Sequence, residues 1–317
     1  MKKKILSMLI MSAVVLGMVG CSGTETSVTT TVGDVTTTIT NETATSETTA
    51  TAEETTDDDI SILTENNLLS NDVAIISETV IVDEAGIKIT AKELKDGILG
   101  TELKVLIENN SGKDLTIQCR NTSINGYMVE NMLSADVTNG KKVNDSITFM
   151  SSDFKKCGIE QIADMEFSFY IFDSESWDTY LETDLIQITT SISDSYEYKF
   201  DDNGNLLYDN DGIRIIEKGL SEDSFFGLGV TVYIENLTEN NITVQTKDVA
   251  VNGFMVDPVF SCDVSANKRA VSEITFFESD FEENGITDIE NLELSFHIFN
   301  TDNWNDIANT DAITLNF

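Results

Sequence analysis

The stretch MEFSFYI, residues 165–171, decides the fold. Every second side chain in it, from Met165 to Ile171, is apolar. Because successive side chains of a strand point to opposite faces of a sheet, this alternation predicts a half-buried β-strand. The stretch returns as LELSFHI, residues 292–298, with the same alternation. The chain therefore carries one strand pattern twice.

The recurrence extends well beyond these two strands. Residues 107–189 align with residues 234–316 at a constant offset of 127 and without a gap, and 31 of the 83 positions are identical. NGYMV, which ends at Val129, returns in this way as NGFMV, which ends at Val256. We interpret this as a tandem duplication of a domain of about 110 residues, which is long enough to bury its own core and far longer than a solenoid unit.

The duplication sets the expected domain boundaries. We expect the first domain, repeat 1, at residues 80–190 and the second, repeat 2, at residues 206–317, with a linker at 191–205. Residues 59–79 form a transition for which a short helix and an edge strand both fit.

Other segments of each repeat alternate in the same way. Seven or eight short strands per repeat are expected, separated by turns such as those at residues 110–113 and 139–140. This spacing is typical of an all-β fold. We therefore expect two tandem immunoglobulin-like domains, each an antiparallel sandwich of two sheets.

Each repeat should also contain one short helical turn. SDFE in repeat 2 has the form of a capping box, in which Ser279 caps the N-terminus and Glu282 reaches back to it. Gly285 then suits the left-handed stop of the helix. Repeat 1 keeps the stop at Gly158 but has Lys155 in place of the glutamate.

Four stretches carry a resemblance to known proteins: IENNSGKDLTIQCRNTSINGYMV at 107–129, LYDNDGIRI at 207–215, SCDVSANKRAVSEITF at 261–276 and ELSFHIFNTDNW at 293–304. Over about residues 80–317 the chain resembles tandem repeats of uncharacterised lipoproteins from gut Firmicutes. It is more distantly similar to the immunoglobulin-like domain of the immunoprotective extracellular protein of Gram-positive bacteria. The resemblance implies the fold and a Gram-positive source. It implies no activity and no catalytic residue.

The N-terminus reads as an export signal. Three lysines precede an apolar run that ends at Gly20-Cys21, too short for a membrane-spanning helix. The ending Met18-Val19-Gly20-Cys21 resembles a bacterial lipobox, apart from Met18 where leucine is usual. This resemblance implies removal of residues 1–20 and lipidation of Cys21 by a palmitate-type diacylglyceryl group, whose two chains anchor stably. The alternative is a plain signal peptide with a chance cysteine.

A polar segment follows Cys21. In residues 22–58, 16 of 37 residues are threonine, and none is aromatic or basic. Such a composition cannot bury enough apolar surface to fold, so residues 21–58 are expected to be a disordered tether, spanning roughly 30–40 Å as a flexible coil. Threonine-rich tethers of this kind are sites at which O-glycosylation occurs, and the sequence leaves that open.

The formal net charge is −37. Phosphate backbones bind through lysine and arginine, so nucleic acid is an improbable partner, and contact with the membrane is expected through the lipid anchor only. No phosphate-binding loop, HExxH or GxSxG motif is present, and we expect no cofactor. Beyond Cys21, the cysteines are Cys119, Cys157 and Cys262, an odd number that does not suggest a disulfide framework. A Cys119–Cys157 bridge remains an open alternative.

Four aromatic residues are the candidate ligand contacts. Trp177 and Trp304 stand among Asp, Asn and Ser residues, as tryptophans of sugar-binding surfaces do, although an inward tryptophan that plugs the end of a sandwich is commoner. Tyr127 and Phe254 follow the Asn-Gly turns, and we expect them to begin a buried strand rather than to line a ligand site.

Other polar groups have plainer explanations. The acidic segments at 201–205 and 209–212 resemble calcium loops but lack the EF-hand spacing, so we interpret them as hairpin turns and expect no metal. His297 has Tyr170 as its counterpart in repeat 1, which suggests a surface residue rather than a catalytic base.

We therefore expect a lipid-anchored protein on the extracytoplasmic face of a Gram-positive cell membrane that binds a protein, a wall polymer or a host glycan, and is not an enzyme. One alternative is a ligand-delivery lipoprotein of a transporter, which would need two α/β lobes around a cleft. The other is a carboxylate-dependent envelope enzyme. Its candidates would be acids identical in both repeats, such as Asp136 and Asp263, Asp153 and Asp280, or Asp184 and Asp311.

Overall fold

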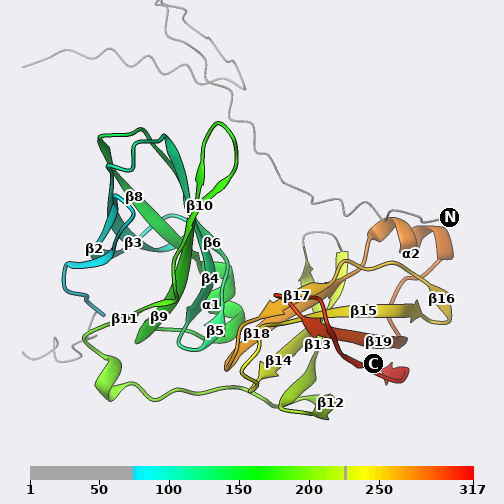
Figure 1. The fold of residues 1–317 in the computed structure, drawn as a ribbon. Coiled ribbons are helices and arrows are strands. Elements are labelled where there is room, and N and C mark those ends of the chain that lie inside the picture. The colour runs from blue at the N-terminus through cyan, green and yellow to red at the C-terminus, as the bar shows by residue number, and fades with distance from the viewer. Residues whose placement is uncertain (1–73, 225–226) are drawn as a thin grey trace, which may run out of the picture. The chain divides into compact units, whose positions relative to one another are not determined.

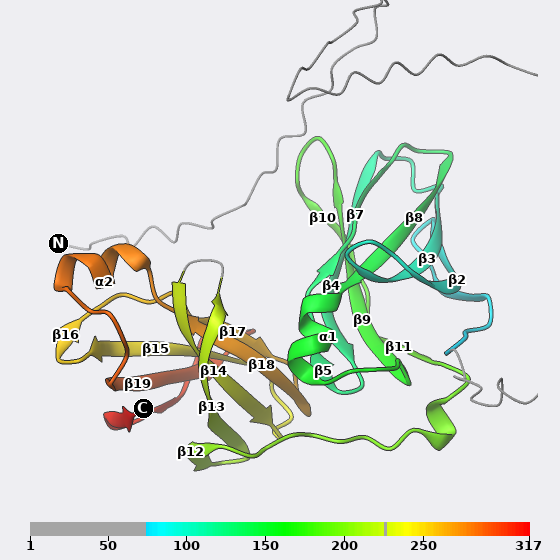
Figure 2. The ribbon, with the colours of Figure 1, turned by 180° about the vertical axis from the view of Figure 1, so that it is seen from behind.

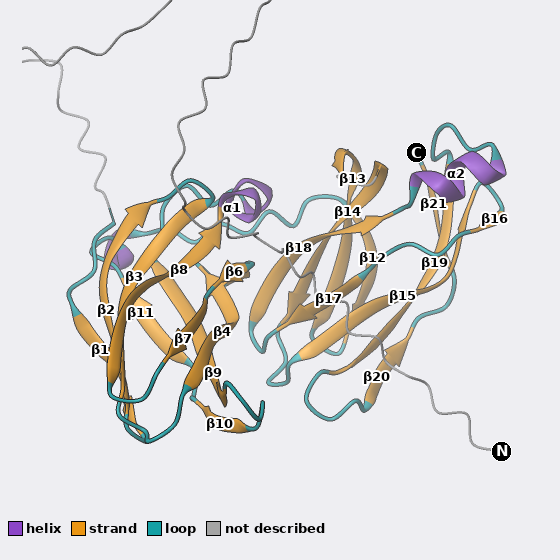
Figure 3. Cartoon of the chain, turned by 90° about the horizontal axis from the view of Figure 1, so that it is seen from above, coloured by secondary structure: helices purple, strands orange, loops and turns teal. Residues whose placement is uncertain are grey.

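Strands dominate the fold, as the alternation predicts. The computed structural model describes residues 74–224 and 227–317. Of these residues 58% lie in strands and only 7% in helices, so the prediction of an all-β protein is confirmed. Figure 3 shows the same balance, with strands coloured throughout and helices confined to α1, α2 and one short turn.

Repeat 1 holds the first eleven strands and the first helix (Figure 1). They are β1 (Thr79–Glu84), β2 (Ile87–Asp96), β3 (Gly100–Asn109), β4 (Leu115–Ile124), β5 (Tyr127–Met128), β6 (Asn131–Met132), β7 (Ser134–Val137), β8 (Lys141–Met150), α1 (Ser151–Cys157), β9 (Asp164–Asp173), β10 (Thr179–Glu182) and β11 (Ile186–Thr189).

Repeat 2 follows in nearly the same order of elements. They are β12 (Asn205–Asn210), β13 (Ile213–Ser224), β14 (Gly227–Asn236), β15 (Ile242–Val251), β16 (Phe254–Met255), β17 (Ser261–Val264), β18 (Lys268–Thr275), α2 (Glu278–Asn284), β19 (Asn291–Asn300), β20 (Asp306–Asn309) and β21 (Ile313–Asn316). A 3₁₀ turn, η1 (Ser193–Ser195), lies in the expected linker.

The strands of each repeat divide between two sheets. In repeat 1, β1, β2, β3, β8 and β6 form one sheet, while β4 pairs with β5, β7 and β9, and β9 also pairs with β10 and β11. In repeat 2, β12, β13, β14 and β18 lie side by side, and β15 and β19 lie at the centre of a separate sheet with β16, β17, β20 and β21. Figure 2 shows β2, β3 and β8 as neighbours from behind. This arrangement is sandwich-like.

The alternating apolar residues form the core. In β9, Met165, Phe167, Phe169 and Ile171 are almost fully buried, and their equivalents in β19 are buried as well. Because strands of both sheets contribute to the same apolar cluster in each repeat, burial of this face is what holds the two sheets together.

The two short helices begin differently from the prediction. The capping box is wrong: α2 starts at Glu278 after the extended residue Phe277, Ser279 lies inside the helix, and no side chain caps it. The predicted stops are confirmed. Gly158 and Gly285 adopt left-handed conformations with φ of 66° and 65°, and each closes the helix through its backbone N–H.

The repeats make direct contact within one compact unit, Asn67–Phe317. A parallel bridge joins β5 of repeat 1 to β18 of repeat 2, where the backbone N–H of Arg269 donates to the carbonyl oxygen of Gly126 over 2.9 Å. The ring of Phe200, from the linker, lies 5.4 Å from the ring of Tyr127, and the guanidinium of Arg269 lies 3.9 Å from the centre of the Phe200 ring. The linker therefore packs against both repeats.

Candidate binding sites

Both tryptophans lie on the surface. Trp177 is 65% exposed and Trp304 is 74% exposed, so the preferred prediction of inward plugs is wrong. Each indole stacks on a buried phenylalanine of its own repeat: Trp177 on Phe172 at 5.4 Å and 16°, Trp304 on Phe299 at 5.3 Å and 15°. One face of each indole therefore covers the sheet, and most of the remaining ring surface is open to solvent.

The turn that carries Trp177 is built by one carboxylate. Asp173 Oδ1 accepts the backbone N–H groups of Glu175 and Ser176 at 3.0 and 3.1 Å, and the N–H of Trp177 donates to the Asp173 carbonyl at 2.9 Å. This geometry places Trp177 at φ 65°, a left-handed conformation that bulky residues rarely adopt. The hydrogen-bonded turn holds the indole in place against that strain.

Repeat 2 builds the same turn with an amide. Asn300 Oδ1 accepts the N–H groups of Asp302 and Asn303 at 2.9 and 3.1 Å, and Trp304 donates to the Asn300 carbonyl at 2.9 Å. Trp304 has φ 62°. Two different side chains thus give one geometry, and the exposed stacked indole recurs in both repeats.

An aromatic row continues from each indole along the strand. In repeat 1 the ring of Tyr170 lies 5.5 Å from Phe172, and the guanidinium of Arg120 lies 3.6 Å above Tyr170. In repeat 2 His297 lies 5.0 Å from Phe299, and its Nε2 lies 2.7 Å from a carboxylate oxygen of Asp306. His297 is thus part of a row with Phe299 and Trp304. This row is not predicted from the sequence, because the alternation describes only the apolar face of each strand, and His297 and Trp304 are interpreted separately.

The residues after the Asn-Gly turns differ between the repeats. Tyr127 is 3% exposed, whereas Phe254 is 47% exposed and the next residue, Met255, is 68% exposed. The prediction of a buried strand therefore holds for Tyr127 and is wrong for Phe254. Both strands are only two residues long. Tyr127 is buried because repeat 2 covers it, through contacts such as the edge-on ring of Tyr233 at 6.5 Å.

Beside each Asn-Gly turn the surface is hollowed, with a volume of about 500 Å³ in repeat 1 and about 640 Å³ in repeat 2. The hollows use equivalent positions: Arg120, Met128, Val129, Glu130, Asp153 and Lys156 in repeat 1, and Lys247, Met255, Val256, Asp257, Asp280 and Glu283 in repeat 2. The sequence contained this signal, because each pair of positions is 127 residues apart.

Among the described residues, only the hollow of repeat 1 is lined by both repeats. Cys262 and Val271, from β17 and β18, line it from the side of repeat 2, and burial raises the pKa of Glu130 inside it. The lining of the repeat 2 hollow comes from repeat 2 alone among the described residues.

Of the acids shared by the repeats, Asp153 and Asp263 line one hollow together with Glu130, and several have structural partners. Asp136 and Asp263 each accept a hydrogen bond of 2.6 Å from a threonine, Thr116 or Thr243, on the neighbouring strand. Asp153 accepts the backbone N–H of Glu130 at 2.7 Å.

The other two identical pairs are not brought together. Asp280 lines the hollow of repeat 2, while Asp153 lines that of repeat 1. Asp184 and Asp311 lie between short strands at the C-terminal end of each repeat.

The three described cysteines are free thiols, so the Cys119–Cys157 bridge is absent. Burial raises the pKa of Cys119, Cys157 and Cys262 to about 12 in each case. These groups are therefore protonated at neutral pH and are poor nucleophiles.

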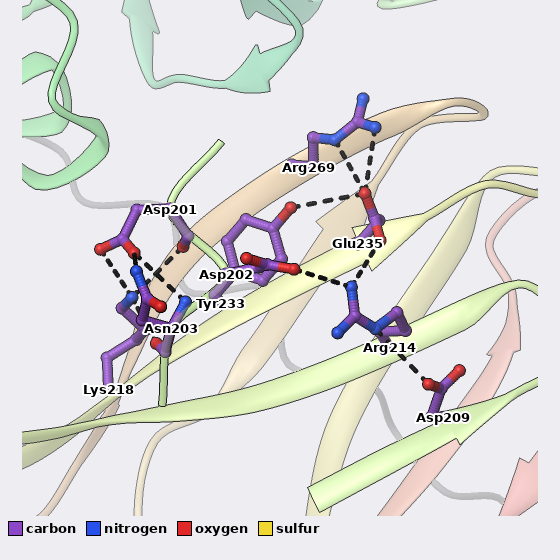
Figure 4. Close-up of polar contacts among 9 residues, drawn as sticks. All are labelled: Asp201, Asp202, Asn203, Asp209, Arg214, Lys218, Tyr233, Glu235 and Arg269. Atoms are coloured by element: carbon purple, nitrogen blue, oxygen red, sulfur yellow. Dashed lines mark hydrogen bonds and ion pairs between the residues drawn. The ribbon is translucent and has the colours of Figure 1, made fainter. Parts of the chain in front are cut away.

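Lysine and arginine already neutralise the acidic segments that resemble calcium loops (Figure 4). Lys218 Nζ lies 2.7 Å from the carboxylate of Asp201. The hydrogen bonds that Lys218 and Asn203 donate to this carboxylate lower the pKa of Asp201 to about 2. Arg214 contacts Asp202 at 3.1 Å and Asp209 at 3.5 Å. No group of three or more histidine, cysteine or acidic residues in the described ranges is arranged to hold a metal ion.

The remaining predictions fall on segments that the structure does not describe. The signal peptide 1–20, Cys21 and the threonine-rich tether lie outside the described residues. Within the described residues, neither helix has the length and apolar character required to cross a bilayer.

Two comparisons with known proteins bear on the family. No protein-family model matches the chain. No curated protein matches its sequence significantly.

Proposed function

We propose that this chain is a lipid-anchored protein on the extracytoplasmic face of a Gram-positive cell membrane. In this proposal Cys21 carries the lipid, and residues 22–58 lift two immunoglobulin-like modules away from the bilayer. The support comes from the charged and apolar parts of the export signal, the lipobox-like MVGC and the tether composition. The strands of each repeat divide between two sheets, one of which is shared by the two repeats, and this division agrees with immunoglobulin-like modules.

The modules bind a glycan or wall polymer through Trp177 and Trp304. One observation carries this assignment: the same exposed, stacked indole recurs in both repeats at a strained backbone position. If each indole served only to cover the sheet, most of its surface would not need to be exposed to solvent. Strained conformations that a surrounding hydrogen-bond network maintains are frequent at functional sites.

The chemistry of the turns fits a sugar ring. A pyranose presents an apolar C–H face, which packs on a flat aromatic surface, and hydroxyl groups at its edge, which need hydrogen-bond partners. Beside Trp177 the hydroxyl of Ser176 and the carboxylate of Asp178 lie 2.9 Å apart. Asn303 and Asn305 take these places beside Trp304 and supply amide groups instead. Both turns therefore combine an apolar platform with polar edge groups.

Two equivalent sites on one chain suit a repetitive ligand. Each site alone is shallow, so its affinity is expected to be low. A polymer that engages Trp177 and Trp304 together gains from the high effective concentration of the second contact, without any new interaction. We therefore expect polymers to bind far more tightly than single sugars.

The chain contains only these two tryptophans, which makes the test direct. Full chain in detergent is titrated with purified wall polysaccharide and with mucin glycans while indole fluorescence is followed. Trp177→Phe and Trp304→Phe each leave one reporting indole. The double alanine variant has no indole, so its binding is measured by isothermal titration calorimetry, with the unchanged chain as the control. Saturable fluorescence changes in both single variants, together with loss of binding in the double variant, are expected. Retained binding in the double variant would place the ligand elsewhere.

A transporter-associated ligand-delivery protein is the alternative from another class. It requires two α/β lobes, and the described residues instead form sheets with two short helices. The binding proposal is therefore the one that the described geometry favours.

A further inference from the structure

Repeat 1 offers a face to which repeat 2 is docked. The edge strand β18 lies against the NGYMV turn, where Arg269 N–H donates to Gly126. The ammonium of Lys268 lies 2.7 Å from Glu166, and both side chains are only 14% exposed. Strands β17 and β18 form one wall of the hollow beside the turn. We call the side formed by the NGYMV turn, Glu166 and the hollow the acceptor face. We call the side formed by β17 and β18, with Lys268 and Arg269, the inserting edge.

Repeat 2 carries the same acceptor face, and no described residue covers it. Phe254 is exposed where Tyr127 is buried, and Glu293 is exposed where Glu166 is largely covered. Met255 is 68% exposed at the mouth of the open hollow. An apolar patch of this kind, beside a hollow whose equivalent in repeat 1 is walled by a neighbouring repeat, marks an interaction surface.

Repeat 1 likewise carries an unused copy of the inserting edge. Its strand β8 is equivalent to β18, with Lys141 in the place of Lys268 and Lys142 in the place of Arg269. One side of β8 pairs with β3 along its whole length, while on the other side its only described partner is β6, at Thr148 and Phe149. The stretch that begins at Lys141 is therefore an open strand edge, which is a template for pairing with another chain.

The charges of the two unused surfaces are complementary. Four acids, Asp248, Asp257, Asp280 and Glu283, surround the repeat 2 hollow with one base, Lys247. The corresponding positions of the repeat 1 hollow hold two acids and two bases. The acceptor face of repeat 2 is thus the more acidic of the two and suits the Lys141 end of the β8 edge, where Lys142 already pairs with Glu108 of its own repeat at 2.6 Å.

We propose that the NGFMV face of repeat 2 binds the β7–β8 edge of a second chain of this protein, so that chains associate head to tail. Lys141 of the incoming chain pairs with Glu293, and its Lys142 N–H donates to the Gly253 carbonyl, as Lys268 and Arg269 do within the chain. The interface is heterologous, since acceptor and edge lie on different repeats. Repetition of such a contact builds an open array.

This contact between chains is expected to be weaker than the equivalent contact between the two repeats of one chain. Upstream of the gap-free alignment, residues 86–89 match residues 212–215 at an offset of 126. At this offset Ala74 is the equivalent of Phe200, which contacts Tyr127 and Arg269, so the incoming chain lacks that aromatic contact. The net charge of −37 also opposes association between chains. Association between chains therefore requires a high local concentration and salt. Within one chain the linker at 191–205 keeps the two repeats close together, so the equivalent contact forms readily.

Cross-linking by a carbodiimide tests the pairing directly, because this reagent joins an amine to a carboxylate only when the two touch. Isotopically light and heavy full chains are mixed in nonionic detergent at up to about 1 mM and about 0.15 M salt. We expect a Lys141–Glu293 cross-link that joins light to heavy chains. The Lys268–Glu166 cross-link, always within one chain, is the internal control. Absence of the mixed cross-link while the control forms would overturn the proposal.

Charge reversal provides the second test and fixes the polarity. Glu293→Lys and Lys141→Glu should each weaken self-association by at least about tenfold. A mixture of the two variants should recover association, because Lys141 of the Glu293→Lys chain still pairs with Glu293 of the Lys141→Glu chain, and the two reversed side chains also attract each other. Equal association of all samples, or no recovery in the mixture, would exclude the head-to-tail contact. Unchanged circular dichroism of both variants confirms that they fold.

Discussion

Tyr127 and Tyr233 meet edge to face, with ring centres 6.5 Å apart and planes at 75°, although they belong to different repeats. Burial raises the pKa values of both phenols. Such aromatic pairs add to the energy of the area that they bury. The first NG turn therefore does more than reverse the chain, because the residue that follows it anchors one repeat to the other.

Tyr127→Ala and Phe254→Ala form a matched pair in equivalent positions. Removing the buried ring of Tyr127 should lower the free energy of unfolding by about 3–5 kcal/mol, since it leaves a cavity at the contact between the repeats. Removing the half-exposed ring of Phe254 should cost less than about 1 kcal/mol. Urea denaturation followed by circular dichroism measures both. Equal losses would mean that Tyr127 acts only within its own repeat.

Lys268→Ala should separate a covered ion pair from an exposed one. The Lys268–Glu166 pair spans the repeats with 14% of each side chain exposed, and its loss should cost about 1–3 kcal/mol because Glu166 then lacks its charged partner. Lys199→Ala is the control. Its pair with Glu197, at 3.3 Å, is about 80% exposed and should contribute at most about 0.5 kcal/mol. A similar effect of both variants would argue against a covered contact.

Strand positions follow from local pattern, whereas the contact between repeats does not. The alternation of β9 and β19 is a period of two that any half-buried strand shows, so the sequence predicts both correctly. Strand β5 has only two residues, too few for a period, and its bridge to Arg269 depends on a distant segment. The sequence thus predicts the burial of Tyr127 correctly but for the wrong reason. It predicts burial within a strand, whereas contact with repeat 2 buries the ring.

Side-chain hydrogen bonds explain the other differences. The tryptophans point outward because Asp173 and Asn300 fold the preceding residues into turns, and apolar patterns carry no information on this. The capping box failed because α2 begins at Glu278, so that Ser279 lies inside the helix and not at its N-cap. In repeat 1 the helix residue Asp153 accepts the backbone N–H of Glu130, a partner that a four-residue motif cannot indicate.

Asn252→Ala should show that the asparagine of each NG turn acts through its side chain as well as its backbone. Its Oδ1 accepts the N–H groups of Glu290 and Asn291 at 3.0 and 2.9 Å, its Nδ2 donates to Asp288, and its φ is 51°. We expect a loss of about 2–3 kcal/mol in unfolding free energy. Asn252→Gly removes the same hydrogen bonds without strain at positive φ, so it should be about 1 kcal/mol less harmful. Identical losses would show that strain plays no part.

Native cysteines should resist alkylation. Because burial raises their pKa values to about 12, Cys119, Cys157 and Cys262 are almost entirely protonated at pH 8. Iodoacetamide should therefore leave all three unmodified in the folded chain, as read by peptide mass spectrometry, and modify all three in urea without prior reduction. Labelling that requires a reductant would reveal a disulfide and contradict the free thiols.

Acid should loosen the turn of Trp177 and spare that of Trp304. The hydrogen bond from Lys113, at 3.0 Å, and those from the N–H groups of Ser176 and Glu175 hold the pKa of Asp173 below its usual value. A carboxylate with a depressed pKa stabilises the fold above its unfolded pKa, and this contribution disappears as the pH falls through the folded pKa. Asn300, the equivalent residue in repeat 2, does not titrate.

Trp304→Phe leaves Trp177 as the only indole, and Trp177→Phe leaves Trp304, so each turn can be followed alone by fluorescence between about pH 5 and pH 2. Trp177 should show a transition with its midpoint below the ordinary aspartate pKa, because protonated Asp173 loses the ion pair with Lys113 and holds the two N–H groups less strongly. Asp173→Asn, which copies the amide of repeat 2, should abolish the transition while leaving the turn intact. An equal acid transition in both single-tryptophan proteins would instead indicate general unfolding, and would show that Asp173 does not control the geometry of its indole.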